Sequence, residues 1–404
     1  MLKKLRLHNF RTYLNAEFSF TQRHLVIGHN NSGKTNLYAA MRFLGASASL
    51  DFSKCVFMVP GGLMEIKNWA FNSNVVELSC ECELLYEGEP HQFAYCLNLI
   101  IEQASGRGGT GDLQPALRVT REELTVNSKQ FGNVVLLTSD GREANMLHEE
   151  QLVRRKQENR VTTLSPRDST MLFKLYELET NRRAILFRRY LTSWTFFTLN
   201  PDQLRFGWKD ASAEWSSLSP SGHNLAIAIF HVKNFNERRY RNILDHVRLI
   251  EPDLQAINFI TAAGQPPFPI IELQRRPQAS WAGLSDGTLR TLAFAWIAEA
   301  VRIDQTSPSD RFSPLIVIEE PENGIFPGQL RPILDWFEEH GSGGQFVFTS
   351  HSPYFINLFD AQRESVTLLR RSNERTEVVP VPIADESDPD RLLLAEQYSM
   401  ELLG

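Results

Sequence analysis

The chain has 404 residues, a formal net charge of −6 and 42% hydrophobic residues, enough for real hydrophobic cores in two or three domains. Its apolar runs are far shorter than the ~18 residues that a membrane span needs, and no signal-peptide core follows the basic start. We therefore expect a soluble, cytoplasmic protein. The four cysteines lack zinc spacing and are expected to be reduced core residues: Cys55, Cys80, Cys82 and Cys96.

Alternation of apolar and polar residues predicts strands at 2–10 and 16–20, and a short apolar strand at 24–27 leads toward the first helix. That helix has apolar residues at i, i+3, i+4 and i+7, namely Leu37, Ala40, Met41 and Leu44. Further strands are expected at 75–85, 91–101, 117–120 and 134–138, with hairpin turns at 88–90 and 139–141. Together they predict an antiparallel β lobe, in which the glycine-rich segment 103–112 is a mobile loop.

The middle of the chain is polar and basic. We expect a linker or exposed arm at 144–170, helices at 171–191 and 225–249, and strands at 194–199 and 269–273. Between 151 and 241, sixteen Lys or Arg occur with eight Asp or Glu, so this segment carries +8 and the rest of the chain −14. Such a segment is either a surface for a nucleic-acid backbone or a set of solvated helix faces.

Residues 28–36 carry the most specific motif. Gly28, Gly33, Lys34 and Thr35 match G-x-x-x-x-G-K-[ST] between a short apolar strand and a helix. Glycines let backbone N–H groups approach phosphate oxygens, and the positive end of the helix adds to the attraction. We expect Lys34 to reach the β- and γ-phosphates and Thr35 to ligate Mg²⁺. The predicted phosphate-binding residues are Gly28, Asn30, Asn31, Ser32, Gly33, Lys34, Thr35 and Asn36.

Two carboxylates follow a continuous apolar strand at 315–318. Strands of this kind are buried in parallel sheets, and ligands bind at the carboxyl edge of such sheets. We expect Glu319 to hold the magnesium shell and Glu320 to polarise the attacking water. The alternative is a solvated strand end.

Two shorter sequence patterns also place polar residues at the end of a strand or the start of a helix. Ser285 and Gly287 begin a helix with an apolar stripe, which predicts either a second anion site or an ordinary serine N-cap. His351 follows a buried strand at 345–350, where an imidazole could reach the γ-phosphate or be purely structural.

The order of these motifs resembles the ABC-class ATPases, specifically the SMC- and RecF-like branch, often grouped with AAA-type ATPases of the overcoming-lysogenisation-defect (OLD) kind. The resemblance rests on residues 9–11, 28–36, 284–288, 318–324 and 349–353. It implies an α/β P-loop NTPase of ABC type with a mixed sheet, an antiparallel β lobe and an inserted helical lobe. The expected segments are 1–50 for the first part of the ATPase head, 51–143 for a β-rich lobe, 144–265 for a basic, mainly helical insertion and 266–404 for the second part of the head.

The resemblance further implies that two heads clamp two ATP molecules with Mg²⁺. Ser285 and Gly287 of one subunit would contact the γ-phosphate held by Lys34 of the other, so the chain would be a homodimer on ATP or part of a higher oligomer. The catalytic set would be Lys34, Glu320 and His351. For the glutamine that senses magnesium in relatives, the candidate is Gln203.

Three hypotheses about the biological role of the chain follow. The first is a DNA-linked ATPase of antiphage defence or DNA repair, in which the basic region 151–241 contacts DNA and a separate effector nuclease cuts. The second is an ATP-gated scaffold that holds a toxin or other effector without binding DNA. We predict no nuclease domain in this chain, because only 53 residues follow His351. A transporter subunit is a third class, which the N-terminal Asn9-Phe10-Arg11 pattern argues against.

Overall fold

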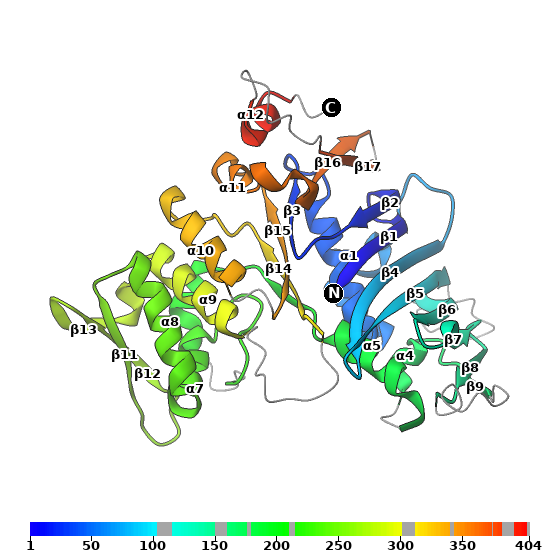
Figure 1. The fold of residues 1–404 in the computed structure, drawn as a ribbon, viewed down its shortest axis with the longest axis horizontal. Coiled ribbons are helices and arrows are strands. Elements are labelled where there is room, and N and C mark those ends of the chain that lie inside the picture. Colours follow the sequence, from blue (N-terminus) through cyan, green and yellow to red (C-terminus); the bar gives the residue numbers. More distant parts are fainter. Residues whose placement is uncertain are drawn as a thin grey trace, which may run out of the picture. The chain divides into compact units, whose positions relative to one another are not determined.

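A computed structural model describes most of the chain, and the statements below concern those residues: 1–102, 115–149, 160–175, 179–209, 215–300, 312–339, 343–373, 375–381 and 392–401. The chain forms two compact units (Figure 1). The first comprises Met1–Trp194, Gln305–Leu315 and Glu364–Val381, and the second Thr195–Asp304, Ile316–Arg363 and Pro382–Gly404. The predicted loop at 103–112 lies outside the described residues. The four predicted segments remain a prediction about domain organisation.

The first unit contains an eight-stranded antiparallel sheet in the order β2-β1-β4-β5-β6-β7-β8-β9. Side chains along β4 alternate between buried and partly exposed, so Cys80 and Cys82 share its buried face. All four cysteines are free; three of them are buried, whereas Cys96, which was also predicted to be a core residue, is only partly buried. The turn after β4 uses Glu87 and Gly88, both with positive φ, so Glu89 and Pro90 already belong to the next strand. The strands are β1 (Leu2–Phe10), β2 (Tyr13–Ser19), β4 (Val75–Tyr86), β5 (Glu89–Glu102), β6 (Ala116–Ser128), β7 (Gly132–Ser139), β8 (Glu143–Leu147) and β9 (Arg160–Leu164).

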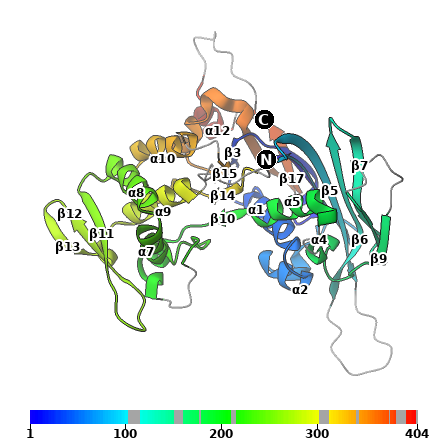
Figure 2. The ribbon, with the colours of Figure 1, turned by 60° about the horizontal axis from the view of Figure 1, so that its bottom comes forward.

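The predicted linker at 144–170 and the predicted helix at 171–191 are both wrong. The first contains β8 and β9, and the second is divided into α4 (Met171–Lys174) and α5 (Arg182–Thr192). A distant buried carboxylate fixes the start of α5, because Glu149 accepts hydrogen bonds from the backbone N–H groups of Arg183 and Ala184. α5 then contacts the large sheet, where Phe187 packs against Phe93 and Tyr95 (Figure 2).

A second buried carboxylate, Glu122, lies at the start of α4. It accepts hydrogen bonds from the backbone N–H groups of Met171 and Leu172 and from the Tyr95 hydroxyl. Burial nevertheless raises the pKa of Glu122 to about 7, well above its usual value of 4.5.

This shift predicts a dependence of stability on pH. Between about pH 4.5 and about pH 7 the folded state binds more protons at Glu122 than the unfolded state, so the free energy of unfolding should fall as pH rises, by at most about 1.4 kcal/mol per pH unit. Glu122→Gln removes this contribution. The wild-type free energy of unfolding minus that of the variant should therefore decrease across this range in urea denaturation followed by circular dichroism.

The comparison with the variant is needed because the buried His24, whose pKa burial lowers to about 3, acts in the opposite direction below its usual value of 6.5. That contribution is present in both proteins and cancels in the difference. A difference that stays constant with pH would contradict the assignment to Glu122.

Three further strands of the first unit support the loop at residues 28–33. β3 (Arg23–Ile27) runs parallel to β16 (Val366–Ser372), which pairs antiparallel with β17 (Arg375–Pro380), so this sheet is mixed. The loop leads from β3 into α1 (Lys34–Ser47), as predicted. The short helices that follow are α2 (Phe52–Cys55), η1 (Val56–Met58) and η2 (Gly62–Glu65), and η3 (Glu179–Asn181) precedes α5.

In the second unit, β10 (Thr195–Phe197) and β14 (Leu315–Glu319) are parallel neighbours, and β15 (Gln345–Ser350) lies on the other side of β14. α9 (Asp286–Ala300) packs with α8 (Glu237–Ile250) and α10 (Pro327–Glu339) (Figure 1). Nearly every residue of α9 is buried, because it is a central helix of this unit.

The predicted helix at 225–249 is interrupted. α7 (Leu225–Phe235) ends before Asn236, whose side chain accepts a hydrogen bond from the Arg239 N–H and caps α8. The remaining elements are α6 (Pro201–Phe206), η4 (Gly207–Lys209), β11 (Leu254–Ile260), β12 (Phe268–Leu273), β13 (Arg276–Ser280), η5 (Trp281–Gly283), α11 (Pro353–Asn357), η6 (Asp360–Ser365) and α12 (Leu394–Ser399). Within the described part of the chain, no helix is long and apolar enough to cross a lipid bilayer.

Candidate functional site

The phosphate loop of the first unit can accommodate only glycine at the two glycine positions of its motif. A Cβ on Gly28 would lie 2.4 Å from Ser32 Oγ and 2.6 Å from the Leu369 carbonyl oxygen. A Cβ on Gly33, where φ is +111°, would lie 2.6 Å from Thr376 Oγ1. The loop backbone is therefore packed against its supporting strands without room for side chains at these positions.

Two hydroxyl groups anchor the loop. The Tyr13 hydroxyl on β2 donates to the Gly33 carbonyl at 2.9 Å, and Thr376 Oγ1 on β17 donates to the Ser32 carbonyl at 2.9 Å. Lys34 Nζ donates to the carbonyls of Gly28 and His29. Ser32 Oγ is buried and has no hydrogen-bond partner within the described structure. An unsatisfied donor beside an ammonium group fits an anionic ligand such as a phosphate.

The Asn9-Phe10-Arg11 segment and the adjacent Thr12 form hydrogen bonds with the start of α1. Asn9 and Arg11 have φ of +54° and +51°, so the chain turns sharply on either side of the buried Phe10. Arg11 Nε donates to Asn36 Oδ1 at 2.6 Å, and Asn36 Nδ2 donates to Thr12 Oγ1 at 2.8 Å. Asn36, a predicted phosphate-binding residue, is thus held through its side chain by the first hairpin.

The fit of Gly33 can be tested against a glycine with similar backbone but open space. We expect Gly33→Ala to abolish nucleotide binding, because the new methyl group would displace Thr376 and the loop. Gly88→Ala is the matched control, since Gly88 has φ of +82° but no atom within 4 Å of the position that a methyl group would take. It should share the backbone strain of about 1 kcal/mol yet bind nucleotide normally in a calorimetric titration. Normal binding by Gly33→Ala would contradict the assigned role of the loop.

In the second unit, the two predicted carboxylates lie where β14 ends. Glu319 is the last residue of the strand, and its Oε2 accepts a hydrogen bond of 2.8 Å from Thr198 Oγ1, just after β10. Glu320 leaves the strand with φ of +43°, while its N–H donates to the Thr349 carbonyl at 2.9 Å. A left-handed conformation is unusual for a glutamate and is found at functional sites.

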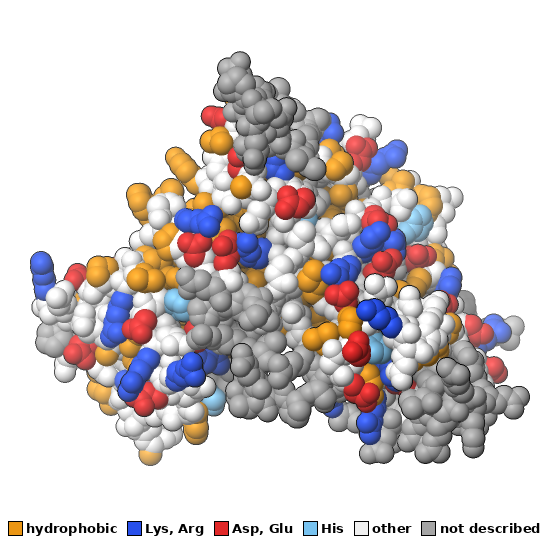
Figure 3. Space-filling view, viewed as in Figure 1, with side chains coloured by type: hydrophobic (Ala, Val, Ile, Leu, Met, Phe, Trp, Pro, Cys, Tyr) orange, Lys and Arg blue, Asp and Glu red, His pale blue; other side chains and the backbone are white. Residues whose placement is uncertain are grey.

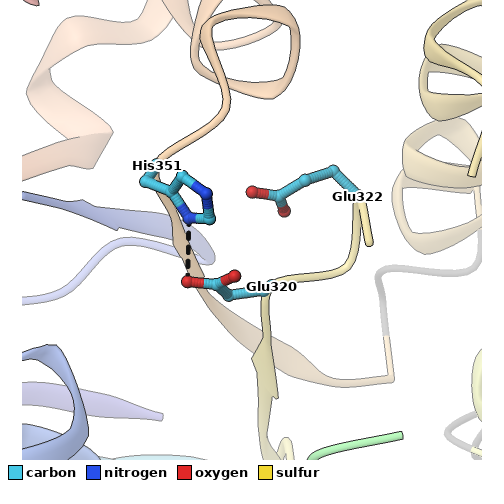
Figure 4. Close-up of side chains that lie close together, drawn as sticks. All are labelled: Glu320, Glu322 and His351. Carbon is cyan, nitrogen blue, oxygen red and sulfur yellow. Dashed lines mark hydrogen bonds and ion pairs between the residues drawn. The ribbon is translucent and has the colours of Figure 1, made fainter. Parts of the chain in front are cut away.

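The carboxylate of Glu320 is held from two sides. His351 Nδ1 lies 2.9 Å from Glu320 Oε1, and Asn323 Nδ2 donates to Glu320 Oε2 at 3.0 Å (Figure 4). His351 and Glu320 are both partly accessible to solvent, with 46% and 27% of their side chains exposed. The strand ends therefore bring Glu320 and His351 together, with the Glu320 carboxylate oriented by two partners before any substrate arrives.

A third acidic residue, Glu322, completes this cluster. Ser350 Oγ donates to Glu322 Oε1 at 2.5 Å, whereas Glu322 Oε2 is buried and lacks a hydrogen-bond partner among the described residues. Burial raises the pKa of Glu322. One candidate ligand atom each from Glu320, Glu322 and His351 lie within 4.8 Å of one another.

Ser285 and Gly287, for which the sequence suggested a second anion site or an N-cap, lie beside the loop that carries Glu320. Ser285 Oγ accepts a hydrogen bond from the Thr288 N–H at 3.0 Å, so Ser285 does cap α9 while its side chain stays exposed. A Cβ on Gly287 would lie 3.0 Å from the Gly324 carbonyl. The buried Arg290 donates to the Leu199 carbonyl at 2.6 Å and, at 3.5 Å, to the Glu320 carbonyl. The start of α9 is thereby connected to the loop that carries Glu320.

Comparison with known proteins supplies the context for these two sets of residues. Residues 1–184 match the sequence model of an "AAA ATPase domain" family, and residues 160–357 match that of "AAA domain, putative AbiEii toxin, Type IV TA system". Among solved structures, an SMC head bound to the C-terminal winged-helix domain of ScpA matches with a TM-score of 0.52 and 13% identity, over 99% of both chains. The chain has the fold of an SMC/ABC-like P-loop ATPase. The predicted fold class is thereby confirmed.

Two further SMC heads match the chain over nearly their whole length. The SMC head domain of Thermotoga maritima has 13% identity and a TM-score of 0.42 over 94% of this chain and 99% of its own. The SMC head of Pyrococcus furiosus, with an extended coiled coil and bound to a ScpA C-terminal domain, has 14% identity and a TM-score of 0.44 over 100% and 98%. No curated protein matches the sequence significantly.

Sequence reasoning missed several residues of the candidate site. Thr198 is a polar residue directly after the buried strand β10. The same sequence pattern led to the prediction for Glu319 and could have identified Thr198. Arg290 could have been noticed as a cation within an otherwise apolar helix, and Glu322 as the third carboxylate of the Glu-Glu-Pro-Glu run. The role of Gln203 stays a prediction. Its side chain is exposed, and its N–H donates to Asn200 Oδ1 at the start of α6.

Proposed function

We propose that the chain binds ATP with Mg²⁺ and hydrolyses it, with Glu320 as the group that polarises the attacking water. The observation that carries the proposal is the geometry of Glu320, whose carboxylate is oriented by His351 and Asn323 at the end of a buried strand. The AAA ATPase and SMC-head similarities support it, since both describe ATPase architectures.

Each predicted residue then has a role that its chemistry permits. The loop N–H groups and Lys34 hold the phosphates. Thr35 and Glu319 would supply oxygen ligands for Mg²⁺, and the ion would neutralise charge on the phosphates. Glu320 would draw a proton from the attacking water. His351 shares a hydrogen bond with Glu320, and its proposed second role is to contact the γ-phosphate.

A phosphate-release assay on the purified chain with ATP and Mg²⁺ tests this directly. We expect phosphate release that EDTA abolishes. If ATP and Mg²⁺ gave no release above a protein-free control, at any protein concentration tested, the proposed activity would be refuted.

We further propose that ATP joins two copies head to head, with Ser285 and Gly287 of one copy completing the phosphate site of the other. Ser285 is exposed at the start of α9, and Gly287 is partly exposed. The absence of a side chain on Gly287 lets its backbone pack closely against the Gly324 carbonyl. The SMC head bound to a ScpA domain supports a further proposal, that this chain also carries a partner protein.

For the biological role, we propose a DNA-linked process of defence or repair, with a relation to the OLD ATPases and a separate effector nuclease. The family model matched by residues 160–357 names a toxin–antitoxin system, which supports a defence role. The alternative is an ATP-gated scaffold that holds an effector without contacting DNA.

One observation favours that alternative. Several arginine side chains of the basic region interact with other residues of the same chain. Three form ion pairs, Arg183 with Glu149, Arg205 with Asp286 and Arg241 with Glu237. Arg239 lies over the ring of Trp296. On the face shown in Figure 3, Lys and Arg side chains are interspersed with Asp and Glu. Arg154, Arg155 and Lys156 lie outside the described residues.

Binding to labelled duplex DNA separates the two roles. Direct DNA binding should weaken steeply between about 50 and about 200 mM salt, because phosphate contacts release counterions. Absent or salt-independent binding would favour the scaffold.

A further inference from the structure

The cluster at the end of β14 contains a group to which the proposed hydrolysis of ATP assigns no role. Glu322 is only 9% exposed, and its carboxylate faces Glu320 and His351 (Figure 4). Its Oε2 has no hydrogen-bond partner in the described part of the chain. Nearly all buried polar atoms in proteins are paired, because an unpaired one costs free energy. Glu322 Oε2 is therefore a buried acceptor that a cation bound within this cluster would satisfy.

The donor set identifies the class of cation. An imidazole nitrogen and two carboxylate oxygens are typical ligands of Zn²⁺ and related transition metals, whereas Mg²⁺ and Ca²⁺ prefer oxygen alone. In a tetrahedral site with bonds of about 2.1 Å, neighbouring ligand atoms lie roughly 3.4 Å apart. The candidate ligand atoms lie within 4.8 Å of one another, so small side-chain rotations would bring all three onto one ion.

The surrounding hydrogen bonds already orient the carboxylates. Ser350 holds Glu322 Oε1 and Asn323 holds Glu320 Oε2. The remaining oxygens are Glu320 Oε1, which lies 2.9 Å from His351 Nδ1, and the unpartnered Glu322 Oε2, and both are available as ligands. Outer hydrogen bonds of this kind fix ligand orientation in metal sites. Glu320, at φ +43°, is further fixed by the hydrogen bond from its N–H to the Thr349 carbonyl.

We infer that Glu320, Glu322 and His351 form a binding site for one divalent transition-metal ion, with Zn²⁺ as the best-fitting candidate, and that the bound ion inhibits ATP hydrolysis. The inhibition follows because a Glu320 carboxylate that ligates a metal ion cannot accept a proton from water. This site is separate from the Mg²⁺ ligands proposed above, Thr35 and Glu319. The binding site stands on its geometry alone, whereas the inhibitory effect rests on the proposed ATPase function.

The test is a calorimetric titration of Zn²⁺ into the nucleotide-free, chelator-treated full chain. We expect one Zn²⁺ per chain for the wild type and an affinity loss of about tenfold or more for Glu322→Gln. Glu237→Gln, which removes an exposed carboxylate paired with Arg241 on its own helix, is the matched control and should bind Zn²⁺ like the wild type. If Glu322→Gln unfolds, as its circular dichroism would reveal, His351→Gln serves the same purpose. Equal Zn²⁺ binding by the wild type and the ligand variants, or none by the wild type, would overturn the inference.

Phosphate release with Mg²⁺, with and without Zn²⁺, then tests the inhibition. The ratio of the rate with Zn²⁺ to the rate without it should be well below one for the wild type and for Glu237→Gln, and much closer to one for Glu322→Gln. A wild type that binds Zn²⁺ but does not hydrolyse ATP would refute the proposed function and leave the metal site standing. A wild type that hydrolyses ATP equally well with Zn²⁺ bound would refute the inhibition.

Discussion

Replacing Glu320 by Gln is expected to lower the rate of ATP hydrolysis by about 10²- to 10⁴-fold, the usual contribution of a positioned general base. The amide keeps the size of the side chain and can still accept the hydrogen bond from Asn323, but it cannot take a proton. ATP binding should persist, because the phosphate-binding residues belong to a different loop. Phosphate release and calorimetric ATP binding measure the two effects separately.

Glu237→Gln is the control here as well, since it removes an exposed carboxylate in α8 and should retain the wild-type rate. If Glu320→Gln hydrolysed ATP as fast as the wild type, the assignment of Glu320 as the residue that polarises water would be contradicted.

Lys34→Ala is expected to weaken ATP binding by roughly 10- to 100-fold, which corresponds to the ~1.5–3 kcal/mol of hydrogen bonds to a charged group. Lys34 is nearly buried, and its ammonium group lies against the carbonyls of Gly28 and His29, within the loop that would surround the phosphates. Calorimetric titration with ATP in the presence of Mg²⁺ measures the loss.

Lys54→Ala provides the comparison, because Lys54 is a surface residue whose side chain is 65% exposed. Its removal should leave ATP affinity unchanged. An equal loss of ATP affinity in the two variants, or no loss in either, would contradict the assignment of Lys34 to the nucleotide site.

Local sequence patterns predicted the parts of this fold that depend on local physics. The alternation at 75–85 and the apolar spacing after Thr35 each correspond to an observed element, β4 and α1, because burial on one face requires that periodicity. The motif at 28–36 could be recognised because glycine is needed where the backbone approaches another chain segment or a ligand closely. Gly28 and Gly33 both lie in such positions.

Features set by distant residues could not be predicted this way. The helix expected at 171–191 is divided because Glu122 and Glu149, 49 and 34 positions away from the N–H groups whose hydrogen bonds they accept, fix two separate helix starts. No window of local sequence contains that information. The same holds for Arg290, whose guanidinium reaches the Leu199 carbonyl 91 positions away.

The candidate site was predicted in outline and completed by the structure. The rule that polar residues following buried strands lie where ligands bind identified Glu319, Glu320 and His351 as candidates. The structure brings Glu320 and His351 into contact. The rule could not identify Thr198 as the partner of Glu319, because the neighbouring strand of β14 was not known from the sequence. Nor could it reveal that Glu322 turns inward, since exposure of a turn residue depends on tertiary packing.

The proposed sandwich of ATP between two copies is tested most directly by the molecular mass of Glu320→Gln, measured by light scattering with ATP and Mg²⁺. A mass close to twice that of the chain is expected with ATP, a single-chain mass without nucleotide, and a single-chain mass with ATP when Ser285→Arg is added to block the opposing surface. If Glu320→Gln binds ATP in calorimetry but keeps the same mass with and without it, or if Ser285→Arg leaves the ATP-dependent dimer intact, the account of Lys34 and Ser285 acting on one γ-phosphate is contradicted.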